Sequence, residues 1–206
     1  MDTKGPNAPQ AIPVHDGAEA FVELLVNNGV EYIFINSGTD TYPILEAISR
    51  MNEQERIAPE VVLCLDENTA MSAAHGYWQA TGHAQVVMVH VDAGTMAIGG
   101  AYHNAQRDHA AIVVCAGKAP LTIDSGMLGE RDNYIHWTQE QRDQAGAVRT
   151  FTKWDYEIRW PAQLPDVVHK AFQVTNSEPT GPVYMMMPRE VLMARMDSVL
   201  LPDSSR

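Results

Sequence analysis

The sequence predicts an α/β fold: an open, mostly parallel six-stranded sheet with helices on both faces, arranged in three layers. Short runs of apolar, often β-branched residues alternate with segments whose apolar residues recur at helical spacing. Strands that are apolar throughout are typical of parallel sheets covered on both faces, and their alternation with helices indicates right-handed crossovers. The strands also end in polar turns of Gly, Ser, Thr or Asp, which would line the edge where such sheets bind ligands.

The predicted elements follow from these patterns in chain order. Strands are expected at residues 30–35, 61–65, 85–91, 111–116, 151–160 and 183–187. Helices are expected at residues 17–28, 41–51, 68–80, about 98–105 and 163–175. Asp16 is suited to cap the first helix, and Asn28-Gly29 is suited to end it. Residues 118–150 show no regular period and are expected to form a long excursion.

This order of elements predicts one domain over residues 15–190. Residues 1–14 are polar and contain several prolines, so a flexible lead-in is expected there. Residues 191–206 have no clear period and are expected to be a linker towards a further domain. No run approaches the roughly 20 apolar residues of a membrane span, so no membrane contact is expected.

Composition narrows the function classes. The formal net charge is −12, with 14 basic and 26 acidic residues and no Lys/Arg cluster, which argues against a nucleic-acid-binding surface. Cys64 and Cys115 each lie inside an apolar run, so both are expected to be small buried hydrophobes, and a reducing cytoplasm fits. The histidines do not complete a zinc spacing with cysteines or carboxylates, so no metal site is predicted within the chain.

Glu67 is the first candidate for chemistry. It follows the apolar run 61–65 and precedes an alanine-rich helical segment. A carboxylate at the end of a buried strand is expected to be partly desolvated, which raises its pKa and makes it a better proton donor near neutrality. Position alone fits equally well a glutamate that only complements the dipole of the following helix. Its neighbour Asp66 is expected to be a helix cap or a solvent-facing carboxylate.

His90 is the second candidate, because it ends the third predicted strand at the same edge of the sheet. Histidine is the side chain best suited to proton transfer near neutral pH, although a structural histidine satisfied by hydrogen bonds is the alternative. Residues 36–39 and 92–95 form two short glycine-containing turns that could present backbone N–H groups to a polar ligand. Neither turn matches a dinucleotide or phosphate-loop motif.

Several stretches in sequence order together resemble one family, over about residues 15–195. The matching residues are Gly17-Ala18, Phe21, Leu25, Gly29-Val30, Ile33-Phe34, Glu67, Ala70, Ala73-Ala74, Gly76-Tyr77, Thr81-Gly82, Asp108-His109, 112–117, Thr152-Lys153-Trp154, Gly181-Pro182-Val183 and Pro188. This set resembles the pyrimidine-binding domain of thiamine diphosphate-dependent enzymes, in the group of acetolactate synthase and pyruvate or benzoylformate decarboxylase.

The resemblance implies a role for Glu67. In this family the matching glutamate hydrogen-bonds N1′ of the cofactor's aminopyrimidine and favours the imino tautomer, whose 4′-nitrogen removes the proton from the thiazolium C2. The resemblance also implies that His90 is catalytic and lies near the substrate, a small 2-keto acid.

The same comparison assigns further positions to the site. Thr39 matches the place of a hydroxyl near the substrate. Asn36, Ser37 and Gly38 match the loop whose backbone contacts the pyrimidine, and Gly94 matches the turn beside the cofactor.

Some positions depart from the family pattern. The usual Pro-Gly of the first loop is Ser37-Gly38 here, and the Gly-Pro-Gly turn of acetolactate synthases is residues 92–94, Asp-Ala-Gly. These departures leave open the substrate and the choice between decarboxylase and carboligase. The second family motif, Gly-Asp-Gly with a later Asn, binds Mg²⁺ and the diphosphate and does not occur in this sequence.

The resemblance therefore implies a partner and an assembly. A diphosphate-binding domain is expected, either in the same full-length protein or in a separate subunit, within a homodimer or tetramer. The cofactor is thiamine diphosphate with Mg²⁺ held by that second domain, and a need for FAD is left open. Without the second domain the chain is expected to be inactive.

Two rival interpretations come from other classes. One is a non-catalytic ligand-binding or assembly domain that keeps the fold; the retained Glu67 argues against it and the altered turns argue for it. The other is a flavodoxin-like domain that binds a nucleotide alone, which the lack of a phosphate loop disfavours.

Overall fold

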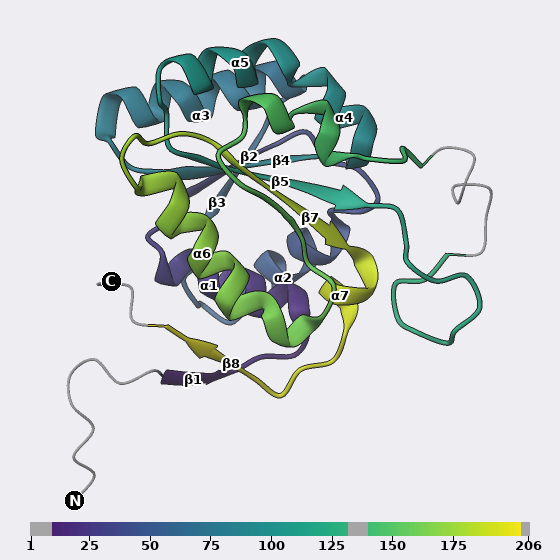
Figure 1. Cartoon of the computed structure of the whole chain (residues 1–206). Helices are drawn as coiled ribbons and strands as arrows, with labels where there is room; N and C mark the ends of the chain where they lie inside the picture. The colour runs from purple at the N-terminus through teal and green to yellow at the C-terminus, as the bar shows by residue number, and fades with distance from the viewer. Residues whose placement is uncertain (1–9, 132–139, 203–206) are drawn as a thin grey trace, which may run out of the picture.

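A single parallel sheet forms the middle layer of the chain (Figure 1). The computed structural model describes residues 10–131 and 140–202. The sheet has six strands in the order β3-β2-β4-β5-β7-β6, and every neighbouring pair is parallel. Its strands are β2 (Tyr32–Ile35), β3 (Glu60–Leu63), β4 (Gln85–Val89), β5 (Ile112–Lys118), β6 (Asp155–Glu157) and β7 (Val183–Pro188). The predicted α/β fold with a six-stranded parallel sheet is confirmed.

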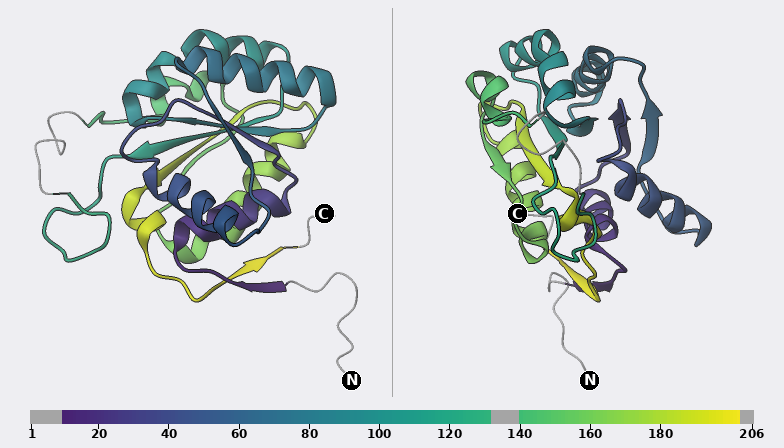
Figure 2. Two further views of the ribbon diagram at one scale, coloured as in Figure 1. Left: turned by 180° about the vertical axis from the view of Figure 1, so that it is seen from behind. Right: turned by 90° about the vertical axis from the view of Figure 1, so that its right-hand side faces the viewer.

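Helices cover both faces of this sheet, as the views from behind and from the side show (Figure 2). One face carries α1 (Gly17–Asn27), α2 (Tyr42–Glu53) and α6 (Leu164–Asn176). The other carries α3 (Glu67–Thr81), α4 (Val91–Ala97) and α5 (Gly99–Arg107). A short helix, α7 (Arg189–Met193), follows β7. The described residues also form 3-10 turns at η2 (Ala145–Ala147), η3 (Arg149–Phe151) and η4 (Pro161–Gln163).

The apolar strand runs arise because the central strands are buried from both sides. In β4, Val86 and Met88 join the hydrophobic cluster under α1, α2 and α6, whereas Val87 and Val89 join the cluster under α3 and α5. Alternate residues of a strand point to opposite faces, so a strand between two helical layers needs apolar residues at every position. None of the described helices is long and apolar enough to cross a membrane.

The strand before Glu67 differs from the prediction. It was expected to be buried, but β3 lies at the edge of the sheet and pairs only with β2. As a result Leu63 is 66% exposed and Leu65, just beyond the strand, is 92% exposed. An apolar run alone does not tell a central strand from an edge strand that another surface could cover.

The segment after β4 also differs from the prediction. Residues 92–95, expected to be a turn, lie inside the helix α4, and the single helix expected near 98–105 is α5, which begins at Gly99. Ile98 separates the two helices.

Both ends of the described chain are more ordered than predicted. The strand β1 (Gln10–Pro13) pairs antiparallel with β8 (Ser198–Leu201), with Ile12 opposite Val199. Val199 is buried and belongs to the hydrophobic core on the α1 and α6 side of the sheet, so the β1–β8 pair packs against α1 and α6 (Figure 1). Parts of the predicted flexible lead-in and of the predicted linker are therefore folded.

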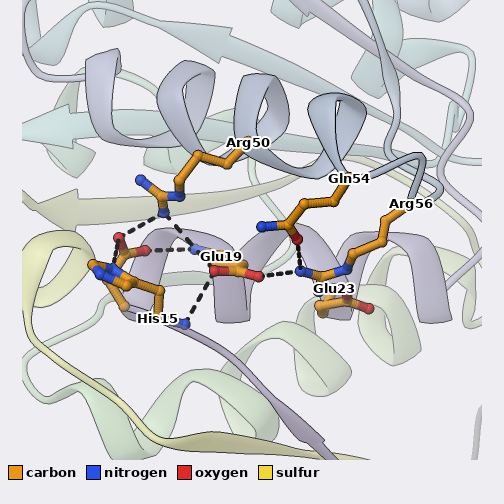
Figure 3. Close-up of polar contacts among 7 residues, drawn as sticks. His15, Glu19, Glu23, Arg50, Gln54 and Arg56 are labelled. Carbon is orange, nitrogen blue, oxygen red and sulfur yellow. Dashed lines mark hydrogen bonds and ion pairs between the residues drawn. The ribbon is translucent and has the colours of Figure 1, made fainter.

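Two buried carboxylates on α1 tie this helix to the end of α2 (Figure 3). Glu19 and Glu23 are buried, and the guanidinium of Arg56 donates to both of them. Arg50 on α2 donates to Asp16, the N-cap of α1, at 2.7 Å. A buried carboxylate is costly unless it is paired, so the tight packing of α1 on α2 depends on these arginines.

Replacing Arg56 with Ala should expose this dependence. The variant leaves the buried Glu23 without its cation and leaves Glu19 with only Arg50, at 3.9 Å. We expect a loss of about 2–3 kcal/mol in the free energy of unfolding, below the fully buried case because Arg56 is 30% exposed. The measurement is urea unfolding of the purified chain. Arg107→Ala is the matched control, because Arg107 is an exposed arginine at a helix end, and it should change stability by less than about 0.5 kcal/mol. Equal losses in both variants would contradict the prediction.

Candidate functional site

Three loops meet at the carboxyl edge of the sheet. β2 lies between β3 and β4, so the segments that follow these three strands are neighbours. The chain leaves β2 towards α2 on one face and leaves β4 towards α4 on the other face. This reversal is a topological switch point, the position at which open parallel α/β sheets usually bind their ligands.

Glu67 is the first residue of α3 and lies at this edge. Asp66 is the N-cap, as predicted, and its Oδ1 accepts a hydrogen bond from the Thr69 amide at 3.0 Å. Glu67 is half-buried, and within residues 10–131 and 140–202 its carboxylate has no hydrogen-bond or ion-pair partner. Since Asp66 already caps the helix, the Glu67 carboxylate is left available to a ligand.

Gly94 makes room for this carboxylate. A Cβ at Gly94 would lie 3.2 Å from Oε1 of Glu67 and 3.1 Å from Cβ of Val89. The backbone N–H of Gly94 donates to the His90 carbonyl at 2.7 Å inside α4, so this N–H of the expected turn is not available to a ligand. Gly94 instead lets α4 approach Glu67 closely. The role of Gly94 beside the cofactor stays a prediction.

Some backbone N–H groups of the loop after β2 already form hydrogen bonds within the protein. The backbone N–H of Asn36 donates to the Met88 carbonyl at 3.2 Å, and the backbone N–H of Gly38 donates to Oγ1 of Thr41 at 3.2 Å. Ser37 and Thr39 are exposed at the edge of the sheet. The structure thus brings residues 36–39 to the same edge as Glu67 and His90; their roles towards cofactor and substrate stay predictions.

Asp40 is a site residue that the sequence interpretation missed. Its buried carboxylate forms a hydrogen bond through Oδ1 with Nδ1 of His90 and accepts the Val91 amide at Oδ2, at 3.2 Å. The hydrogen bond between the His90 ring and the Asp40 carboxylate raises the pKa of His90, and burial opposes this rise. The negative charges of Asp92 and Glu67 also raise the pKa of His90. No spacing rule pairs these residues, because 50 positions separate them along the chain.

A buried polar group supports the floor of the site. The Thr95 hydroxyl of α4 lies 2.6 Å from the Tyr184 hydroxyl of β7, and the Gln144 amide donates to that hydroxyl at 2.9 Å and to the Gly117 carbonyl at 2.8 Å. Burial raises the pKa of the Tyr184 phenol, so the phenol stays neutral and serves as a hydrogen-bond group. These bonds fix α4, and with it His90 and Gly94, against the sheet.

This fold and site define a cofactor-binding α/β domain, and comparison with known families identifies its kind. The model of the family described as "Thiamine pyrophosphate enzyme, N-terminal TPP binding domain" matches residues 15–147. The chain belongs to this family.

Curated relatives that this chain resembles include acetolactate synthases. The chain is 29% identical over 176 residues to the mitochondrial acetolactate synthase catalytic subunit of Aspergillus candidus, covering 85% of the chain and 23% of that protein. It is 28% identical over 190 residues to the acetolactate synthase of Arthrospira platensis, covering 92% of the chain and 31% of that protein. The chain thus spans about a quarter to a third of the length of these relatives.

Solved structures agree on the fold. A putative thiamin diphosphate-dependent enzyme from Mycobacterium smegmatis superposes with a TM-score of 0.71 at 25% identity, covering 87% of this chain and 31% of that one. The thiamine diphosphate-dependent 4-hydroxybenzoylformate decarboxylase of Rhodococcus jostii also gives a TM-score of 0.71, at 24% identity, covering 92% and 32%.

Gly117→Ala should disturb the Asp40 carboxylate directly. A Cβ at Gly117 would lie 1.7 Å from Oδ2 of Asp40, so we expect a loss of about 1–3 kcal/mol in unfolding free energy from overpacking. Gly76→Ala is the control, because Gly76 is an exposed helical glycine with nothing within 4 Å of its Cβ position, and it should stabilise by about 0.5–1 kcal/mol. The measurement is thermal and urea unfolding of both variants. A Gly117→Ala variant as stable as wild type would show that Asp40 is not confined in this way.

Proposed function

We propose that this chain is the pyrimidine-binding domain of a thiamine diphosphate-dependent 2-keto acid decarboxylase or carboligase of the acetolactate synthase-like group. The observation that carries the proposal is the Glu67 carboxylate. It is half-buried at the carboxyl edge of the sheet, packed against Gly94, and without a partner among the described residues. Its position matches the family glutamate, and an unpaired carboxylate in a crevice fits a ring nitrogen that needs a hydrogen-bond partner.

The cofactor, when bound, supplies an electron sink for decarboxylation of a 2-keto acid. Glu67 would share a proton with N1′ of the aminopyrimidine, which would be the chain's main contribution to activation. The loop of Asn36, Ser37 and Gly38 would contact the pyrimidine through backbone groups other than the Asn36 and Gly38 N–H, which are already bonded to Met88 and Thr41. Gly94 keeps the space beside Glu67 open.

Two further side chains face the substrate in this proposal. His90 moves a proton to or from the 2-keto acid or its product, and its raised pKa keeps a larger fraction of it protonated near neutral pH. The Thr39 hydroxyl, exposed at the same edge, contributes a hydrogen bond to the substrate.

The surface around Glu67 supports a site completed by a second domain. Leu63 and Leu65, just before Glu67, are 66% and 92% exposed, and Met96, two residues beyond Gly94, is 59% exposed. Exposed apolar side chains on the segments that carry Glu67 and Gly94 would be suited to a surface that another protein surface covers. The proposed occupant is the diphosphate-binding domain, which supplies Mg²⁺ and the diphosphate site, within a homodimer or tetramer. A cytoplasmic location stays a prediction, since some of the relatives are mitochondrial or chloroplastic.

Glu67→Gln tests the proposed role of the carboxylate. In the enzyme assembled with its diphosphate-binding domain, we expect exchange of the cofactor C2 proton to slow by about 10²-fold or more, because the amide cannot exchange a proton with N1′. The exchange is followed by NMR after acid quench in D2O. Glu60→Gln, an exposed glutamate at the other end of β3, is the control and should exchange at the wild-type rate. Unchanged exchange in Glu67→Gln would refute the assignment and favour the non-catalytic alternative.

The purified chain alone should show no turnover. With thiamine diphosphate, Mg²⁺ and a panel of 2-keto acids, we expect no release of CO2 above the protein-free rate, because the chain lacks the diphosphate motif. Activity should appear when the diphosphate-binding domain is added. Decarboxylation by the chain alone would contradict the shared site.

A further inference from the structure

The burial of the Asp40 carboxylate has a free-energy cost for the fold. The side chain is only 4% exposed, and its one ion-pair partner among the described residues is His90. Taking a carboxylate out of water is costly unless it is paired and hydrogen-bonded. Both of its oxygens are used, Oδ1 by the His90 ring and Oδ2 by the Val91 amide.

The surrounding backbone is shaped around this pair. A Cβ at Gly38 would lie 2.0 Å from Nδ1 of His90 and 2.6 Å from Oδ1 of Asp40, and one at Gly117 would lie 1.7 Å from Oδ2 of Asp40. Side chains cannot be accommodated at such distances without displacing the pair. The loop after β2 and the end of β5 therefore carry glycine where they pass the pair.

The backbone of Val91 is held in an unfavourable conformation beside it. Val91 has φ +28°, a region that β-branched residues rarely adopt, and its amide donates to Oδ2 of Asp40 at 3.2 Å. Strain of this kind persists only where neighbouring contacts enforce it, and it is concentrated at functional sites. Asp40 thus fixes both the imidazole of His90 and the peptide that follows it.

We propose that Asp40 is the positioning residue of the active site, holding His90 with its proton on Nδ1 so that Nε2 faces the substrate across the switch point. This inference rests on the proposed function of His90. An N–H at Nδ1 that donates to Asp40 leaves Nε2 as the acceptor of the neutral ring and the donor of the charged ring. Within the described residues Nε2 has no hydrogen-bond partner, so it is free for a ligand.

The charges around His90 act in the same direction. Asp40 comes from the loop before α2, Glu67 from α3 and Asp92 from α4, and each of these carboxylates raises the pKa of His90. Of these three carboxylates, Asp40 is the one that forms a hydrogen bond to the ring, so Asp40 selects which nitrogen carries the proton. The Asp92 carboxylate instead accepts hydrogen bonds from the backbone N–H groups of Ala93 and Gln141, at 3.0 and 2.9 Å.

The first test needs no cofactor. In the uniformly ¹⁵N-labelled chain, two-bond ¹H–¹⁵N spectra above the His90 pKa should show a protonated Nδ1 and an unprotonated Nε2. In wild type the His90 ring and the Val91 N–H contact opposite oxygens of Asp40, so in D40N one of them would face the side-chain NH2 instead of an acceptor. The Nε2–H tautomer of His90 should therefore become populated in D40N. The pKa of His90 should fall by about 1 because the negative charge beside it is lost. D92N, which removes charge but no bond to the ring, should keep the wild-type tautomer.

The results that overturn the proposal are also specific. A wild-type ring protonated on Nε2, or an unchanged tautomer in a folded D40N chain, contradicts it; if D40N does not fold, the wild-type tautomer decides alone. In the assembled enzyme D40N should lower kcat by roughly 100-fold with KM little changed and should shift the His90 limb of the pH profile to lower pH. An unchanged kcat and pH profile would overturn the positioning role, whereas failure of the proposed function itself is read from Glu67→Gln.

Discussion

The parallel pairing of β2 between β3 and β4 is the constraint on which the site depends. This register puts the ends of three strands side by side, although their loops are separated by tens of residues along the chain. Because β2 is followed by a helix on one face and β4 by a helix on the other, the chain reverses direction at this point, which is where open α/β sheets usually bind ligands. Glu67, His90 and the loop at residues 36–39 reach the same edge of the sheet only through that arrangement.

The fold uses buried carboxylates in two different ways. Glu19 and Glu23 are paired with a guanidinium, a cation that does not lose its charge in proteins, so their network fixes α1 on α2 at any physiological pH (Figure 3). Asp40 is paired with an imidazole, whose charge changes near neutrality. The first pairing stabilises the packing of α1 on α2 independently of pH. The second places a group that titrates near neutral pH at the proposed active site.

The sequence predicted the central part of the molecule well because local patterns determine it. Continuous apolar runs identify β4, β5 and β7, and Asp16 was recognisable as a helix cap from its place before an amphipathic segment. Contacts between distant segments were missed: the edge position of β3, the β1–β8 pair, and the Asp40–His90 bond. Each of these is decided by which strands become neighbours, and no local periodicity carries that information.

The edge position of β3 has a consequence for how this domain exists as a separate piece. An edge strand offers unpaired backbone groups, and apolar side chains such as Leu63 and Leu65 beside it make that edge a template for pairing with another copy. The same surface is the one that we propose a diphosphate-binding domain covers. Assembly with that domain would then complete the active site and cover the aggregation-prone edge in one step. On this proposal an unassembled chain would be both inactive and prone to aggregate.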